Sequence, residues 1–274
     1  MKMPNTKTPL LAAFFLTFVL AGCNQDSTTR PTTDLACNSP TTPIAIVQGS
    51  GPKSDMVGQV LGVQGIVTLV QPGEGVYIEE PGSDNNPRTS KAIFIETNND
   101  RLAMQPGTSI YVEGTVAELS KGRNSLTALV DINKIENCGP KQDLPLSTFE
   151  LPMQGLDREA IEAMRVSHSG TLTISDNYNL NKGQISVSDD GILYTATELM
   201  QPGDKANEYA RRNQAHTLPL ELQQPELGSQ TYELGASIRN VVGVMTHDNR
   251  ELRLNVSSMT SAAAGHSSAV LKWR

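Results

Sequence analysis

The stretch from Ile44 to Val70 places the tightest limit on how this chain can fold. It holds two β-rich runs, residues 44–48 and 59–70, separated by a segment rich in Gly, Pro, Ser and Asp that cannot continue a strand. The second run alternates valines with small or polar residues and contains Gly62 and Gly65. Glycines inside a long strand are typical of a strand that bends sharply to close a small barrel. We therefore expect a β protein whose first long strand bends to close a barrel.

Turn signals divide residues 44–138 into a first domain made of short strands. Gln71-Pro72-Gly73, the segment 81–87, Gln105-Pro106-Gly107 and Lys121-Gly122-Arg123-Asn124 all favour turns. The strands expected between them are residues 44–48, 59–70, 75–80, 92–96, 109–118 and 125–136. About five principal strands in roughly 95 residues suit the OB-fold, a five-stranded Greek-key barrel.

The rest of the chain indicates a second unit of the same kind. Residues 139–164 form a Pro-rich connector with a short helix at 157–164, capped by Asp157. Residues 165–256 form the second OB-like domain, with strands at 165–176, 183–187, 193–196, 236–245 and 251–256 and a helical insertion near 206–214. Residues 257–274 are rich in Ser and Ala and are expected to be a poorly ordered tail. The predicted fold is mainly β, with two tandem OB-fold-like small barrels and a helical insertion in the second.

The N-terminal segment predicts export. Lys2 and Lys7 precede an apolar run that is too short to span a bilayer. Residues 1–22 resemble the signal peptide of bacterial lipoproteins, because the run ends in Leu20-Ala21-Gly22-Cys23; the resemblance implies a lipid on Cys23, and Asn24 favours the outer membrane of a Gram-negative bacterium. Ordinary secretion, with Cys23 as a free thiol, is the alternative. Residues 23–43 are polar and Pro-containing and are expected to form a disordered tether.

The two remaining cysteines, Cys37 and Cys138, flank the first domain. An exported protein meets an oxidising compartment, where an even pair favours a disulfide. The alternative, a metal site, lacks nearby ligands. In the chain-entropy model, closing a loop of about 100 residues stabilises the fold by about 4.7 kcal/mol.

Several motifs resemble the N-terminal region of bacterial extracellular endonucleases of the endonuclease/exonuclease/phosphatase type. The resemblance begins with IAIVQGSG and VGQVLGVQGIVT and continues through GVYIEEPGSDNNPRTSKAIFI, SIYVEGTVAEL, LTISDNYNLNKGQISVS and GVMTHDNRELRL. In that family, OB-like domains precede a metal-dependent nuclease domain. The resemblance covers residues 44–254, and the nuclease domain would begin near Arg274. It therefore implies an OB-like fold and an accessory role, without the catalytic residues.

The formal charge of −7 counts against a dedicated nucleic-acid binder, unless a local basic face overrides it. An OB-fold binds single strands through aromatic platforms beside cations. Glu79, Glu80 and Glu113 lie in the same strands as the candidate tyrosines and oppose such binding, and the alternative is that the aromatic residues belong to the core. The candidate ligand-binding residues are Tyr77, Arg88, Lys91, Phe94, Tyr111, Lys121, Arg123, Arg165 and Tyr178.

No catalytic or metal site is predicted. The four histidines, His168, His216, His247 and His266, are scattered, and there is no HExxH, no close His/Cys cluster and no G-x-S-x-G. We expect no cofactor. The leading hypothesis is a non-catalytic, lipid-anchored outer-membrane protein that acts as an OB-fold binding or interaction module. It would bind single-stranded nucleic acid weakly, or an envelope protein or a separately encoded nuclease. The alternatives are an exported nuclease or hydrolase with an unrecognised site, and a purely structural envelope lipoprotein.

Overall fold

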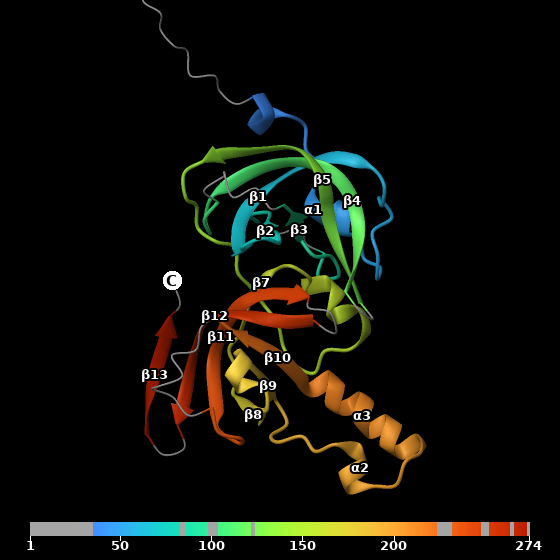
Figure 1. Ribbon diagram of the computed structural model, residues 1–274, viewed down its shortest axis with the longest axis vertical. Coiled ribbons are helices and arrows are strands. Elements are labelled where there is room, and N and C mark those ends of the chain that lie inside the picture. Colours follow the sequence, from blue (N-terminus) through green and yellow to red (C-terminus); the bar gives the residue numbers. More distant parts are fainter. Residues whose placement is uncertain are drawn as a thin grey trace, which may run out of the picture. The chain divides into compact units, whose positions relative to one another are not determined.

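The computed structural model describes residues 35–82, 86–97, 104–121, 124–223, 232–247, 252–263 and 266–272. They belong to one compact unit and are mainly β, in two sheets (Figure 1). The first sheet is a closed barrel with the strand order β1-β2-β3-β5-β4. Its neighbours are antiparallel, except for the parallel pair β3–β5. The strands are β1 (Val60–Gln71), β2 (Gly75–Glu79), β3 (Ala92–Glu96), β4 (Ser109–Lys121) and β5 (Asn124–Gly139).

Strand β1 closes the barrel because it pairs on both sides. Its first half, up to Ile66, pairs with β4, and its second half, from Ile66 to Gln71, pairs with β2. At Gly65, one residue before the change of partner, a Cβ atom would lie 3.1 Å from the carbonyl oxygen of Glu79. The glycine therefore permits a close approach of the β1 and β2 backbones.

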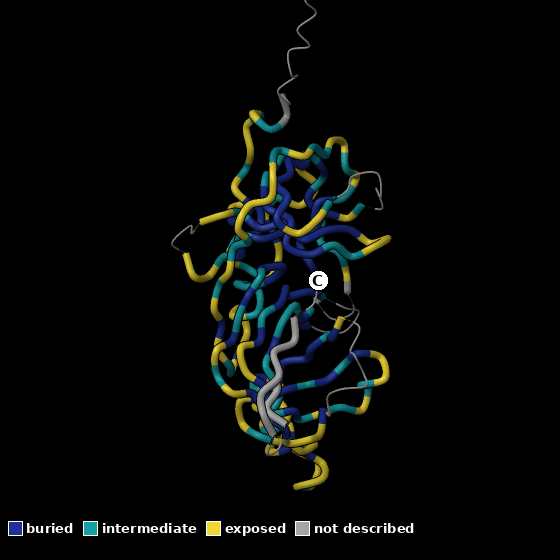
Figure 2. The backbone as a smooth tube through the Cα atoms, turned by 90° about the vertical axis from the view of Figure 1, so that its left-hand side faces the viewer, coloured by how far each residue is buried: buried dark blue, intermediate teal, exposed yellow. Residues whose placement is uncertain are grey.

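Strands β2 and β3 are buried on both faces. Figure 2 shows that buried stretches of the chain lie in both its upper and its lower part. Val76 and Ile78 of β2 belong to a core cluster inside the barrel. The alternate residue Tyr77 belongs to a second cluster, which also contains side chains from the connector and the second sheet. Strand β3 repeats this alternation, with Ile93 inside and Phe94 outside. Because successive side chains of a strand point to opposite faces, the outer face of the first barrel is packed against the second sheet.

The second sheet has eight strands in the order β13-β12-β10-β9-β8-β11-β7-β6, and β12 also pairs with β11. The pairings β8–β9, β9–β10, β10–β12, β12–β11 and β11–β8 return to their starting strand, and β10–β12 is the parallel pair. This is the sequence of pairings found in the first barrel. The strands are β6 (Ser147–Thr148), β7 (Arg165–His168), β8 (Leu172–Asp176), β9 (Gln184–Ser188), β10 (Thr217–Leu222), β11 (Ser237–His247), β12 (Leu252–Ala263) and β13 (His266–Lys272).

The strand expected at residues 44–48 is wrong, because this segment is the short helix α1 (Ile44–Gln48). Ile44 and Val47 are both fully buried in the barrel core, whereas Ile46 is 63% exposed. Burial at i and i+3 is the spacing of a helix and not of a strand. Gly49 follows with a φ of 71° and ends the turn. A 3₁₀ turn, η1 (Leu35–Asn38), precedes α1 in the chain.

The connector contains two 3₁₀ turns, η2 (Gly155–Asp157) and η3 (Glu159–Ile161), in place of the helix expected at 157–164. The Asp157 side chain does accept a capping hydrogen bond, from the backbone N–H of Gln154 at 2.9 Å. Ala163 adopts a φ of 62°, so a helix cannot continue through it.

In the second unit, residues 165–176 form two strands, β7 and β8, with Gly170 between them, and not one. The segment 193–196 is not a strand, because Thr195 and Glu198 form a capping box that begins helix α2 (Ala196–Leu199). The helical insertion is confirmed as α3 (Asp204–His216). A 3₁₀ turn, η4 (Leu180–Lys182), precedes β9.

Three strands, β6, β10 and β13, were not expected, and β6 lies in the segment predicted as the connector. β10 carries Pro219 between β9 and β12, where proline normally argues against a central strand. Of the residues that we expected to belong to a tail, 257–263 instead extend β12 and 266–272 form β13.

Cys37 and Cys138 form a disulfide with a Cα–Cα distance of 5.4 Å. The predicted bridge thus links η1 to the end of β5. Cys23 lies outside the described residues. Among the helices of the described part of the chain, none is long and apolar enough to cross a membrane.

Candidate binding groove

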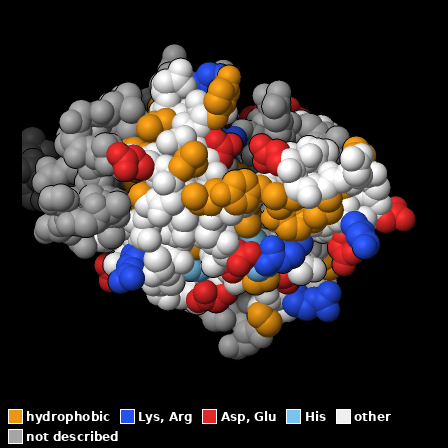
Figure 3. All heavy atoms as spheres, turned by 90° about the horizontal axis from the view of Figure 1, so that it is seen from below, with side chains coloured by type: hydrophobic (Ala, Val, Ile, Leu, Met, Phe, Trp, Pro, Cys, Tyr) orange, Lys and Arg blue, Asp and Glu red, His pale blue; other side chains and the backbone are white. Residues whose placement is uncertain are grey.

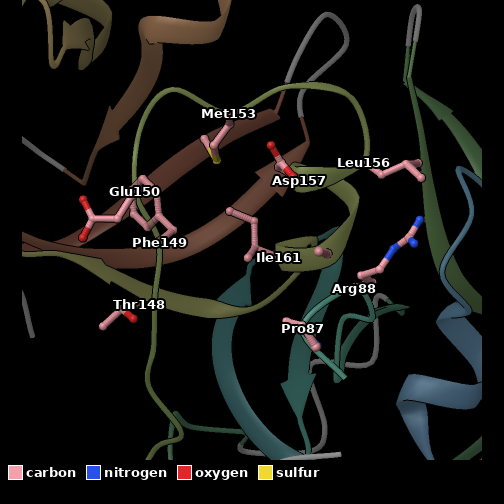
Figure 4. A pocket seen from close by; sticks show the side chains of 10 residues that line it. Pro87, Arg88, Thr148, Phe149, Glu150, Met153, Leu156, Asp157 and Ile161 are labelled. Atoms are coloured by element: carbon pink, nitrogen blue, oxygen red, sulfur yellow. The ribbon is translucent and has the colours of Figure 1, made fainter. Parts of the chain in front are cut away.

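Two adjoining cavities of about 460 and 540 Å³ lie between the first barrel and the connector. They share Pro87, Thr148, Ala160 and Ile161, so they form one groove, which we call the connector groove. One wall is the segment 86–91 between β2 and β3. The opposite wall is strand β6 with its flanking residues, and η3 contributes the floor. Figure 4 shows the side chains that line one of the two cavities.

Strand β6 is the last strand of the second sheet, and one side of it is open. It pairs in parallel with β7, with Ser147 opposite Val166 and Thr148 opposite Ser167. The backbone N–H of Phe149 donates to the carbonyl of Ser167 at 3.1 Å. Odd-numbered residues of this segment therefore direct their backbone groups toward β7, and Thr148 directs its N–H and C=O the other way.

The floor of the groove is apolar, and its two walls differ in charge. Ile161 and Ala160 are partly buried at the base, and Met153 and Phe149 are buried at one end. Arg88 is exposed on the barrel wall. The acidic lining residues, Glu150 and Asp157, belong to the connector.

Beneath the groove, Glu162 joins the connector to the first barrel. Its Oε1 accepts the backbone N–H of Thr127 at 3.0 Å, and its backbone carbonyl accepts the Ser90 hydroxyl at 2.5 Å. Its Oε2 lies 3.6 Å from Nδ1 of His247, at the end of β11. Burial, and secondarily the charge of Glu159, holds the pKa of Glu162 well above its usual range.

Glu79 makes a second connection between the two sheets. Its Oε2 accepts the backbone N–H of Arg165, the first residue of β7, at 2.8 Å. Its Oε1 lies 3.6 Å from the ammonium of Lys91. The side chain is fully buried, and this burial raises its pKa to about 7. Since Glu79 and Glu162 are both buried, neither carboxyl can touch a bound ligand, and both act on the packing between the sheets.

The aromatic residues predicted as stacking platforms lie in the interior. Tyr77, Phe94 and Tyr111 are 1%, 3% and 3% exposed. Tyr77 and Phe94 pack against each other between the two sheets, and the Tyr111 ring occupies the space that Gly62 leaves open. Base stacking requires an exposed ring face, so the expected aromatic face is corrected: these residues belong to the core.

The described candidate cations do not form one exposed basic face. Arg88 is exposed beside the groove, whereas Lys91 donates to the carbonyl of Gly82 at 2.5 Å and faces Glu79. Arg165 is half-buried and donates to the carbonyl of Pro145 at 3.2 Å. The side chain of Lys121 and residue Arg123 lie outside what the structure describes. The structure thus places Arg88 and Lys91 on one wall. Glu79 joins Lys91 to Arg165, because its carboxylate lies 3.6 Å from the Lys91 ammonium and accepts the Arg165 backbone N–H.

Tyr178 is 87% exposed in the turn that follows β8. Other exposed apolar residues of the second unit are Ile192, Tyr194, Leu199 and Leu234. Figure 3 shows a face on which apolar side chains gather among charged ones. Charged neighbours in this unit include the pairs Arg212–Asp190 and His216–Asp189, the latter at 2.8 Å.

Metal-binding side chains do not converge in the described residues, where no group of three or more His, Cys, Asp and Glu could hold an ion. The amino-acid sequence does not indicate that the connector forms one wall of a groove. Its prolines and its Leu146-Ser147-Thr148-Phe149 run were the only signals, and neither indicates which surface the segment faces.

Searches for related proteins found no matching family model, no matching curated protein and no matching solved structure.

Proposed function

We propose that this chain is a non-catalytic, lipid-anchored binding module of the bacterial outer membrane, built from two OB-fold barrels, and that the connector groove holds its partner. The anchor is the lipid on Cys23 that the signal sequence implies. The two-barrel interpretation is supported by the strand pairings. Each unit pairs its strands in the order of a five-stranded Greek-key barrel, with one parallel contact at the corresponding place.

The observation that carries the proposal is that the usual ligand-binding face of the first barrel is covered. An OB-fold usually binds ligands on its second and third strands, but β2 and β3 here are covered by the second sheet. The surface that would bind a strand of nucleic acid is therefore an internal packing surface. The connector groove is concave and has an apolar floor with polar walls, which are features of a ligand-binding site.

We propose a protein partner, and not nucleic acid, for this groove. A nucleic-acid strand needs several phosphate contacts, and the groove offers Arg88 and Lys91 against Glu150 and Asp157. Such balanced charge gives little net attraction for a polyanion. An envelope protein is the partner class that fits both the groove and the predicted location.

Position-specific photo-cross-linking in intact cells tests this function. The photo-reactive residue is placed at Leu146, which is 50% exposed at the groove, or at Val57, which is 52% exposed and is not a lining residue. We expect a discrete protein adduct from position 146 and none from position 57. The same adduct from both positions, or no adduct from position 146, would refute the proposal.

A further inference from the structure

We propose that the connector groove takes its partner as an extended peptide, which adds a strand to the open side of β6. This inference rests on the proposed function and names the kind of partner. It follows from three features of the groove: unused backbone groups, prolines that limit the pairing length, and the charge of the facing wall.

Alternate backbone groups of the β6 segment face away from the sheet. The ladder to β7 uses Ser147 and Phe149, and the carbonyl of Pro145 accepts from Arg165. The N–H and C=O groups of Leu146, Thr148 and Glu150 therefore point away from β7, to the open side of β6. Within the described part of the chain, these groups make no backbone hydrogen bond. A sheet edge with unpaired N–H and C=O groups is a template for another strand.

The open side of β6 faces the connector groove. Thr148 lines both cavities, Leu146 lines one of them and Glu150 lines the other. A strand lies about 4.8 Å from its neighbour, so an added peptide would fall inside the groove. Most sheet edges face bulk solvent, where water satisfies the backbone. Here an added strand would exclude water and bury apolar surface at the same time.

The length of the pairing is limited by proline. Pro145 and Pro152 bound the segment, and proline cannot donate to a ladder. Three residues, Leu146, Thr148 and Glu150, can therefore pair, which corresponds to an extended partner segment of about five or six residues. One face of that segment would rest on Ile161 and Ala160, so we expect apolar side chains at alternate positions.

The charge of the facing wall, residues 86–91, predicts which polar side chains the partner carries. In the described wall segment, residues 86–91, the charged residues are Arg88 and Lys91, with no acid among them. Lys91 is already engaged with Glu79, so Arg88 is the exposed cation. A peptide side chain that points toward this wall would be acidic. The partner is thus an extended segment with alternating apolar residues and an Asp or Glu beside Arg88.

The experiment selects peptides from a random ten-residue phage library on the purified full chain, with Ala160→Trp as a groove-filled variant and Ala160→Ser as its matched control. Enriched peptides are synthesised and their affinities are measured by fluorescence anisotropy. Each is then N-methylated at one backbone position at a time. Methylation removes a donor and leaves the side chains intact.

We expect the effect of methylation to alternate along the peptide. N-methylation at residues whose N–H faces β6 weakens binding about tenfold, the effect of losing one good hydrogen bond, and the intervening positions change it about twofold or less. Amide exchange of Thr148 slows in the complex. A different result is that peptides bind only when the groove is open and yet show no alternating effect of N-methylation and no slowing of Thr148 amide exchange. That result would overturn strand addition and leave the proposed function standing. If no enriched peptide distinguishes Ala160→Trp from Ala160→Ser, both proposals fail.

Discussion

The ring of Tyr77 packs on the ring of Phe94 with a centroid distance of 4.8 Å, on the outer face of the first barrel. Both rings belong to a core cluster that also contains Val244 and Met245 of β11. The two rings therefore fill the contact between the sheets, and the two sheets depend on each other for their packing.

Replacement of Phe94 by alanine should destabilise both sheets together. Removing a buried aromatic ring leaves a cavity and typically costs about 3–5 kcal/mol. We expect urea unfolding to remain a single transition with a lower midpoint. Tyr178→Ala, at an exposed ring, is the control and should change the free energy of unfolding by about 0.5 kcal/mol or less. Two separate transitions in Phe94→Ala, one unchanged from the wild type, would contradict the shared core.

Stability should fall as the pH rises from about 5 to 8. Burial raises the pKa of Glu79 to about 7 in the folded protein, against 4.5 for an unburied carboxyl. The folded state therefore holds this proton more tightly, and the stabilisation is fully present below about pH 4.5 and is lost as the pH passes through 7. For Glu79 the loss amounts to about 3 kcal/mol. The raised pKa of Glu162 acts in the same direction.

Urea unfolding at several pH values measures this effect. Glu79→Gln should flatten the pH profile, because a neutral amide cannot lose the proton. Glu96→Gln, at an exposed position of β3, is the matched control and should keep the wild-type profile. A wild-type stability that is constant or rises between pH 5 and 8 would show that this account of the buried carboxyls is wrong.

Loss of the Cys37–Cys138 disulfide should destabilise the fold without changing the groove. The bridge spans 101 residues, for which the chain-entropy model gives about 4.7 kcal/mol. The double alanine variant should therefore unfold at a clearly lower urea concentration. Its binding of groove peptides should match that of wild type at temperatures where both are folded. No change in the unfolding midpoint would contradict the structural role of the bridge.

Single-stranded DNA should not bind through the first barrel. Tyr77, Phe94 and Tyr111 are buried, and Lys91 and Arg165 are engaged with Glu79 and Pro145. We expect no anisotropy change for a labelled oligonucleotide titrated at low salt, where phosphate contacts are strongest. Saturable binding that Arg88→Ala weakens would restore the nucleic-acid hypothesis.

The sequence predicts the strands of the first barrel well, because turn residues and alternation are local signals. It fails at Ile44–Gln48, where four apolar or small residues in a row suit a strand or a buried helix equally. The periodicity of burial, with Ile46 exposed, emerges only from the tertiary packing.

The aromatic face could not be assigned from the sequence for a related reason. Tyr77 and Phe94 alternate with interior residues in the same way that exposed ligand-binding residues would. Only the second sheet, distant in sequence, decides whether that outer face meets solvent or another core. Likewise, β10 depends on long-range pairing that overrides the local effect of Pro219. Arg88 was predicted as a ligand contact and does line a cavity, but the groove beside it required the connector to be placed.

The central claim is that the connector groove holds the partner of this chain. The most direct test is photo-cross-linking from position 146 in intact cells, in the Ala160→Trp and Ala160→Ser backgrounds. Both variants must first show wild-type urea midpoints. The account predicts that the adduct formed from position 146 persists in the Ala160→Ser background, where the added hydroxyl leaves the groove open. It should disappear in the Ala160→Trp background, where the indole fills the groove. An adduct of equal yield in both backgrounds would contradict the account.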